Sequence, residues 1–324
     1  VVLYCLLTLV AQGFSIGEIA EWSPNKTPRL LFQAISLFVI IAFVGLLRPL
    51  PEMKLNEFIL RSYQLFALTI LVEWVLVNLF AVPNSMMPGY RDSIFYASQF
   101  EATYRPFGLT GNASVNGSLL VIALWILVSL GKIKSVHRYI LATGLILILN
   151  NSGQALLVYL ASVIFYYIKV THGLARYAVA AALIGIAATA VFSGIFTKIS
   201  YDYIMSVLRF VGIENIILMD ATSQIVGGYG AYSWIYEDVR LTTEFYPIYA
   251  ISRFGYLLFG LTWLYIILRL PRNNRTLIAL ALFLGSIHYP TILFVETQVV
   301  LAAYLLWTPR KIEKLDFATS QKDH

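Results

Sequence analysis

Charge is scarce in this sequence. Only 12% of its 324 residues are Asp, Glu, Lys or Arg, about half the fraction that is usual in a soluble domain. Hydrophobic residues make up 59%, and the mean hydropathy is +0.75. This composition excludes an ordinary soluble globule and a disordered chain. The single cysteine, Cys5, excludes a scaffold of internal disulfides.

Motifs of several enzyme classes are also missing. The four histidines and one cysteine are scattered along the chain, so no set of metal ligands emerges. No Walker phosphate loop occurs. We therefore expect no metal, no cofactor and no ATP-driven chemistry.

Long apolar runs recur along the whole chain. Because a membrane span needs about 20 mostly apolar residues, the pattern predicts an all-α, polytopic transmembrane helical bundle with about 10 spans. The spans are predicted at 1–16, 30–48, 62–82, 114–131, 135–150, 154–170, 176–197, 253–269, 274–289 and 290–308.

The basic residues indicate an orientation. The net charge of +6 could suggest nucleic acid, but basic residues in a membrane protein usually mark cytoplasmic loops. Assigning alternate loops to the cytoplasm collects most of the 23 Lys and Arg residues there and leaves the other side slightly acidic. Both termini are thus predicted to be cytoplasmic. The first run lacks a basic segment and a starting Met, so it is more typical of a span in a trimmed or incomplete chain than of a signal peptide.

We expect one integral membrane domain over 1–324, with two long outer loops. The first covers 83–113 and the second, larger one covers 198–252, while 309–324 forms a cytoplasmic tail. Loops longer than about 15 residues in a compact protein are usually functional or disordered, and neither loop has a disordered composition. The start of the second loop, from Tyr201 to Gly212, has the pattern of an interfacial helix.

Several polar residues fall within the apolar segments. The turn Asn150–Gln154 either lies below the outer surface, beside an outward-facing cavity, or follows a helix that simply begins near Lys134. Glu73, in the third span, needs a partner, a proton or water. It is either functional or part of an interhelical hydrogen bond, and the same alternatives hold for Glu296.

The stretch before the fourth span is the most informative. It reads RPFGLTGNASVNG from Arg105 and carries Gly108, Asn112 and Asn116 at the start of that helix. Free backbone amides near a helix start, together with a guanidinium, form a natural anion site. The alternative is a glycine-containing loop with a capping Asn.

This stretch and three others resemble the bacterial O-antigen polymerase and O-antigen ligase superfamily, membrane glycosyltransferases of the GT-C type. RPFGLTGNASVNG is similar to the family's Arg-x-x-Gly element before a span, and LILNNSGQALLVYLAS to its Ser-Arg-x-x-Leu-Leu turn. IVGGYGAY resembles its Gly-x-Gly turn, and EFYPIYAISRFGYLLFG resembles the ligase His-Asn-x-Tyr-Leu segment with a Gly-led helix.

Two departures favour a polymerase over a ligase. Gly153 or Gln154 stands where the family often has Arg, and Glu244 stands where a ligase would have histidine. The resemblance implies a metal-independent polysaccharide polymerase of the bacterial inner membrane. Its substrate would be an undecaprenyl-diphosphate-linked oligosaccharide, transferred on the periplasmic face onto a lipid-linked repeat unit. Membrane lipid and a chain-length regulator are the other expected partners; nucleic acid is not.

The chemistry of this transfer assigns roles to the outer residues. A guanidinium pairs with the departing diphosphate, and a carboxylate removes the acceptor proton. Arg105 and Glu244 are the predicted catalytic residues. Predicted substrate-binding residues are Arg240, Arg253, Gly108, Asn112, Asn116, Tyr246, Tyr249, Asn151 and Ser152.

Three alternative functions remain open. A ligase would pass the glycan to another acceptor. A lipid-linked saccharide transporter or flippase could use Glu73 and Glu296 as coupling-ion sites. A structural membrane subunit would have no ligand at all.

Overall fold

A computed structural model describes residues 42–83, 106–131, 133–173, 246–270, 274–287, 291–294 and 296–306, with Met86, parts of 176–188 and Ile225. In α14 the side chains of 246, 248–254, 258 and 262 lie outside this description. Every regular element in these ranges is a helix. The all-α prediction is confirmed for this part of the chain. The predicted span 1–16 and the tail 309–324 lie outside it, as do most of 30–48 and much of 176–197.

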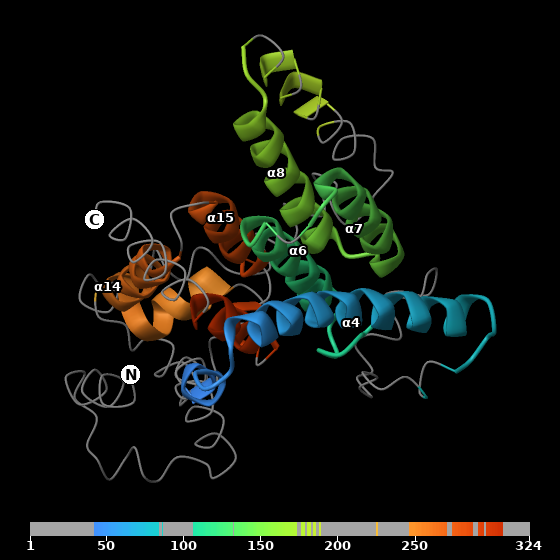
Figure 1. The fold of residues 1–324 in the computed structure, drawn as a ribbon, viewed down its shortest axis with the longest axis horizontal. Helices are drawn as coiled ribbons and strands as arrows, with labels where there is room; N and C mark the ends of the chain where they lie inside the picture. The colour runs from blue at the N-terminus through green and yellow to red at the C-terminus, as the bar shows by residue number, and fades with distance from the viewer. Residues whose placement is uncertain are drawn as a thin grey trace, which may run out of the picture.

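The first long helix, α4 (Glu52–Asn78), starts earlier than predicted. The predicted start at residue 62 is wrong because the first turns are amphipathic. Lys54 and Glu57 are exposed there, while Leu55 and Ile59 are fully buried. Charged residues end an apolar run without ending the helix. In Figure 1, α4 lies across α6 and α7.

The helix α6 (Ala113–Ser129) forms the centre of the described structure. All its residues except Val128 are buried, and it contacts α4, α7, α8 and α15 (Figure 1). Its apolar side chains surround the helix axis on every side, which is the pattern of a helix enclosed by others. The residues from Leu119 to Leu127, including Trp125, therefore supply much of the core.

Two further helices form an antiparallel pair. α7 (Val136–Asn150) ends at Asn151, whose φ of 48° is left-handed, and α8 (Gly153–Val170) begins after Ser152. The helices α6, α7 and α8 correspond to the predicted segments 114–131, 135–150 and 154–170.

The last helices complete the described fold. α15 (Arg275–Gly285) is followed by η3 (Thr291–Leu293) and the helix Glu296–Leu306, within the predicted segments 274–289 and 290–308. α14 (Tyr246–Arg269) begins inside the predicted loop 198–252 and is interrupted at Gly255, with φ 69° and ψ 169°. The ring of Trp263 packs edge-on against Phe283 of α15, with centroids 5.2 Å apart.

The helix ends separate into two groups, which we call the polar end and the basic end. The polar end contains the first residues of α6 and α8 and the last residues of α7 and α15. The basic end joins the opposite termini: His137 Nδ1 and Tyr167 Oη are 2.8 Å apart, and Lys169 donates to Asn274 at 2.8 Å. Lys134, Arg138, Lys169 and Arg275 belong to the basic end.

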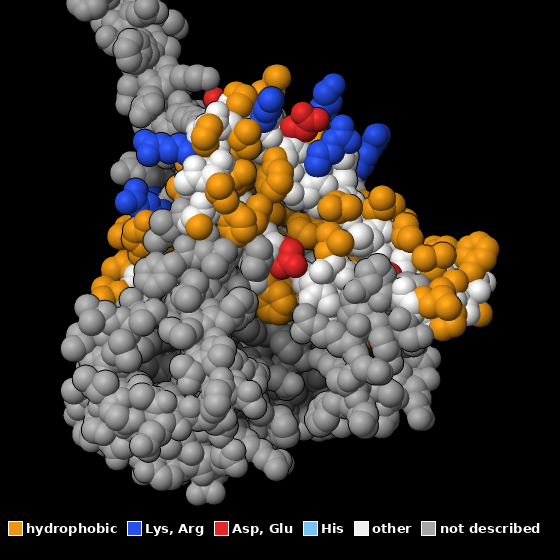
Figure 2. Space-filling view, turned by 90° about the horizontal axis from the view of Figure 1, so that it is seen from below, with side chains coloured by type: hydrophobic (Ala, Val, Ile, Leu, Met, Phe, Trp, Pro, Cys, Tyr) orange, Lys and Arg blue, Asp and Glu red, His pale blue; other side chains and the backbone are white. Residues whose placement is uncertain are grey.

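Two helices in the described ranges, α4 and α8, are long and apolar enough to cross a membrane. α6, α7, α15, Gly255–Arg269 and Glu296–Leu306 are shorter apolar helices. Large hydrophobic side chains are exposed in stripes on three helices. They are Leu65, Leu68 and Val72 of α4, Leu141, Leu145 and Ile148 of α7, and Leu257, Leu261, Leu264 and Leu268 of α14. In Figure 2, hydrophobic side chains cover much of the described surface and Lys and Arg gather near its upper edge.

Candidate functional site

The predicted catalytic residues, Arg105 and Glu244, lie outside the described residues, as does Arg240. Arg253, Tyr246 and Tyr249 belong to α14, where their backbone is helical and their side chains are not described. The other predicted residues, Gly108, Asn112, Asn116, Asn151 and Ser152, all lie at the polar end. The site can therefore be built from the loop 106–112 and its neighbours.

The carboxylate of Glu73 holds this loop from the side of α4. The backbone N–H of Gly108 donates to Glu73 Oε2 at 2.7 Å, and Glu73 is only 5% exposed. From the sequence, Glu73 was expected to be either functional or part of a structural hydrogen bond between helices. Among the described residues, Glu73 contacts the backbone of the loop.

Asn116 holds the same loop from the side of α6. Its Oδ1 accepts from the Thr110 N–H at 3.3 Å, and its Nδ2 donates to the Phe107 carbonyl. Gly108 has a φ of +57°, and a Cβ placed there would lie 1.9 Å from Asn116 Nδ2. Only glycine combines this conformation with this close approach.

Asn112 begins α6 as its N-cap. Its Oδ1 accepts from the N–H groups of Ser114 at 2.9 Å and Val115 at 3.3 Å. Asn112 therefore has the capping role that the sequence analysis gave as an alternative. Asn112 and Glu73 together accept from three backbone N–H groups of the predicted anion site, which are those of Gly108, Ser114 and Val115. The acceptor that the Gly108 amide contacts is a side chain of the protein itself.

The turn between α7 and α8 is tied to the start of α6. Asn150 Nδ2 donates to the Ala113 carbonyl at 2.8 Å, and Ser152 Oγ donates to Ser114 Oγ at 3.0 Å. Asn150 and Ser152 are fully buried. α7 begins at Val136, close to the start near Lys134 that the sequence analysis gave as an alternative to a sunken turn. The polar residues Asn150 and Ser152 of the turn are nevertheless buried in protein.

A contact that sequence reasoning missed connects α8 to α15. Gln154 Nε2 donates to the Gly285 carbonyl, which also accepts from Thr291 Oγ1 at 2.5 Å. A Cβ at Gly285 would lie 3.2 Å from Ser118 Cβ, so α6 and α15 approach closely here. The only signal in the sequence was a glutamine at the start of an apolar helix.

The polar end also contains buried atoms without a hydrogen-bond partner in the described structure. They are Glu73 Oε1, Asn150 Oδ1, Gln154 Oε1 and Ser118 Oγ. Buried polar atoms usually bond to protein or ordered water. Among the described residues no three His, Cys, Asp or Glu side chains come close enough to hold a metal ion.

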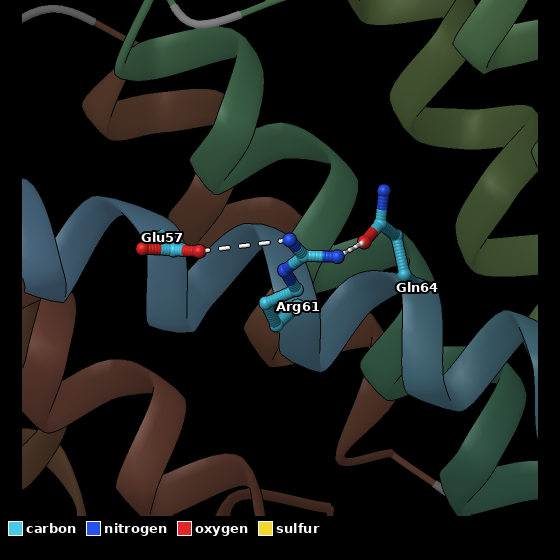
Figure 3. A network of polar contacts seen from close by, with 3 residues as sticks. All are labelled: Glu57, Arg61 and Gln64. Carbon is cyan, nitrogen blue, oxygen red and sulfur yellow. Dashed lines mark hydrogen bonds and ion pairs between the residues drawn. The ribbon is translucent and has the colours of Figure 1, made fainter.

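A second glutamate of α4 shows a contrasting environment. Glu57 Oε1 lies 3.6 Å from Arg61 Nη2, with the two side chains 60% and 72% exposed. Arg61 Nη1 also lies 3.5 Å from Gln64 Oε1 (Figure 3). An exposed pair of this kind contributes little to stability. Glu57 is therefore a suitable control for the buried Glu73.

The remaining acidic candidate lies in the last described helix. Glu296 is half-buried, and Gln298, which is 2% exposed, donates from Nε2 to the Ile292 carbonyl at 3.3 Å. This contact joins the helix Glu296–Leu306 to η3. It gives Gln298 a structural role at the start of that helix.

Comparisons of the chain with protein-family models, with curated proteins and with solved structures gave no match.

Proposed function

We propose that this chain is a membrane-embedded polysaccharide polymerase of the bacterial inner membrane. It would transfer a growing glycan from undecaprenyl diphosphate to a sugar hydroxyl of a lipid-linked repeat unit on the periplasmic face. The bond to the diphosphate breaks, a new glycosidic bond forms, and the acceptor proton passes to a base. The observation that carries the proposal is the anchored loop 106–112 at the polar end.

The position of this loop supports the proposal. Pro106, the sequence neighbour of Arg105, is buried, and the loop after it is held by Glu73 and Asn116. A guanidinium that stabilises a leaving diphosphate gains most when its backbone is fixed before the substrate binds. The described basic residues at the helix termini belong to the opposite end, which the positive-inside rule assigns to the cytoplasm.

The surface of the described helices also supports a membrane location. The exposed leucines of α4, α7 and α14 recur at helical spacing. Stripes of this size are unfavourable in water but suit contact with acyl chains. In this proposal they face lipid, and the polar end faces the periplasm.

Substitution of the two predicted catalytic residues tests the proposal. Arg105→Ala and Glu244→Ala should abolish long polymer in cells whose polymer depends on this chain, at unchanged protein level. Arg269→Ala is the matched control because Arg269 is exposed and contacts the Tyr265 ring at 5.3 Å. Full-length polymer from either Arg105→Ala or Glu244→Ala would contradict the proposal.

A further inference from the structure

We infer that Glu73 is a positioning residue of the transferase, which holds the loop behind Arg105 through the Gly108 amide. The inference rests on the proposed function and adds to it a residue from a different helix. Glu73 and Gly108 are separated by 35 positions in the chain, yet the N–H to carboxylate distance is 2.7 Å. The contact therefore joins α4 directly to the loop that precedes α6.

Because Glu73 is buried, its carboxyl group needs a hydrogen-bond donor. Glu73 is 5% exposed, and its Oε1 has no partner in the described structure. A carboxylate in an apolar helix is strongly disfavoured without a donor. In the described structure that donor is a backbone amide, so stabilising Glu73 and fixing the loop are the same interaction.

The loop is clamped on its other side as well. Asn116 accepts from Thr110 and donates to Phe107, the two residues that flank the Gly108–Leu109 pair. Glu73 and Asn116 thus hold the Phe107–Gly108 peptide group from two helices, one at its N–H and the other at its carbonyl, and Asn116 also holds the N–H of Thr110. Because α4 and α6 are packed against each other, this clamp fixes the loop relative to the bundle.

The test separates the hydrogen bond from the charge. Glu73→Leu removes the acceptor, whereas Glu73→Gln keeps an oxygen that can accept from Gly108. Glu57→Leu is the matched control, an exposed glutamate on the same helix. The full-length variants are reconstituted with an undecaprenyl-diphosphate-linked oligosaccharide, and both kcat and KM are measured. Hydrogen exchange of the segment 107–111 is followed in the same samples.

We expect Glu73→Leu to lower kcat by about tenfold or more with little change in KM, since a small displacement of a catalytic group has effects of this size. Exchange of the Gly108 amide should become faster. Glu73→Gln should restore both properties to near the wild-type values. Glu57→Leu should change neither.

Three outcomes would overturn the inference. One is a folded Glu73→Leu protein with unchanged kcat and unchanged Gly108 exchange. Another is a Glu73→Gln protein as impaired as Glu73→Leu, which would mean that charge matters and not the bond to Gly108. If Glu73→Leu does not fold, Asn116→Ala serves as the second variant, and unchanged kcat and exchange there would refute the clamp.

Failure of the inference is distinguishable from failure of the proposed function. If Arg105→Ala still makes full-length polymer, the polymerase proposal fails, and Gly108 exchange alone still reports whether Glu73 holds the loop. If Arg105→Ala is inactive while Glu73→Leu is fully active, the polymerase proposal stands and the positioning role is refuted.

Discussion

At the scale of single residues, Gly108 has little conformational freedom in the described loop. Its φ is +57°, and its Cα faces the Asn116 side chain so closely that a methyl group cannot fit. Its amide is the donor to Glu73. Three requirements therefore meet at one residue: a left-handed backbone, an absent side chain and a directed N–H group.

Replacement of Gly108 by alanine should destabilise the protein by about 2–4 kcal/mol, combining left-handed strain with a steric clash. Gly131→Ala is the control, because Gly131 has a φ of +66° and a Cβ added to it would meet no atom within 4 Å. It should lose only the strain, about 1–2 kcal/mol. Thermal unfolding in detergent measures both. Equal losses would show that Asn116 moves aside freely.

Substitutions of Asn112 distinguish a capping role from a role in substrate binding. Asn112→Ala removes the acceptor for two amides of α6 and should destabilise the protein by about 0.5–2 kcal/mol. Asn112→Ser retains a capping hydroxyl and should restore most of that stability. The measurement is again thermal unfolding. If the serine variant is as unstable as the alanine variant, capping does not explain the role of Asn112.

The sequence anticipated these residues but not how they pair. Amides before α6 were predicted to bind an anion, and Glu73 was predicted to need a partner. The structure joins the two, since the carboxylate of Glu73 accepts from Gly108. The pairing was not predictable because it depends on how α4 packs against α6, which neither segment encodes alone.

At the scale of elements, close helix packing surrounds α6. A Cβ at Gly117 would lie 2.4 Å from Ala155 Cβ and 2.6 Å from Asn150 Nδ2. The absence of a side chain lets α6 approach both α7 and α8. This approach also allows the buried Asn150 to reach the Ala113 carbonyl.

Gly117→Ala should therefore lower the melting temperature, by an overpacking effect of about 1–3 kcal/mol. Gly260→Ala is the matched control, a helical glycine of α14 with nothing within 4 Å. It should leave stability unchanged or slightly higher, since alanine is the better helix former. A Gly117→Ala protein as stable as the wild type would contradict the close approach.

Helix positions were more predictable than helix ends. The apolar runs located α6, α7 and α8 well because their ends coincide with Asn112, Ser135 and Ser152. The start of α4 was missed because its charged residues share one exposed face. The contact between Gln154 and Gly285 was also missed, since it joins residues 131 positions apart.

At the scale of the whole molecule, the polar and basic ends should face opposite compartments. Cys5→Ser provides a background without cysteine, in which Leu109→Cys marks the polar end and Lys134→Cys the basic end. Leu109 is 43% exposed and Lys134 is exposed. A membrane-impermeant maleimide added to intact bacterial cells should label only Leu109→Cys. Labelling of Lys134→Cys alone would reverse the orientation.

Reconstitution of the purified full-length chain in liposomes with an undecaprenyl-diphosphate-linked oligosaccharide tests the central claim most directly. Mass spectrometry of the lipid fraction should show products longer by whole repeat units, together with released undecaprenyl diphosphate. Substrate that crosses the bilayer with its mass unchanged would contradict the polymerase account and would indicate a transporter.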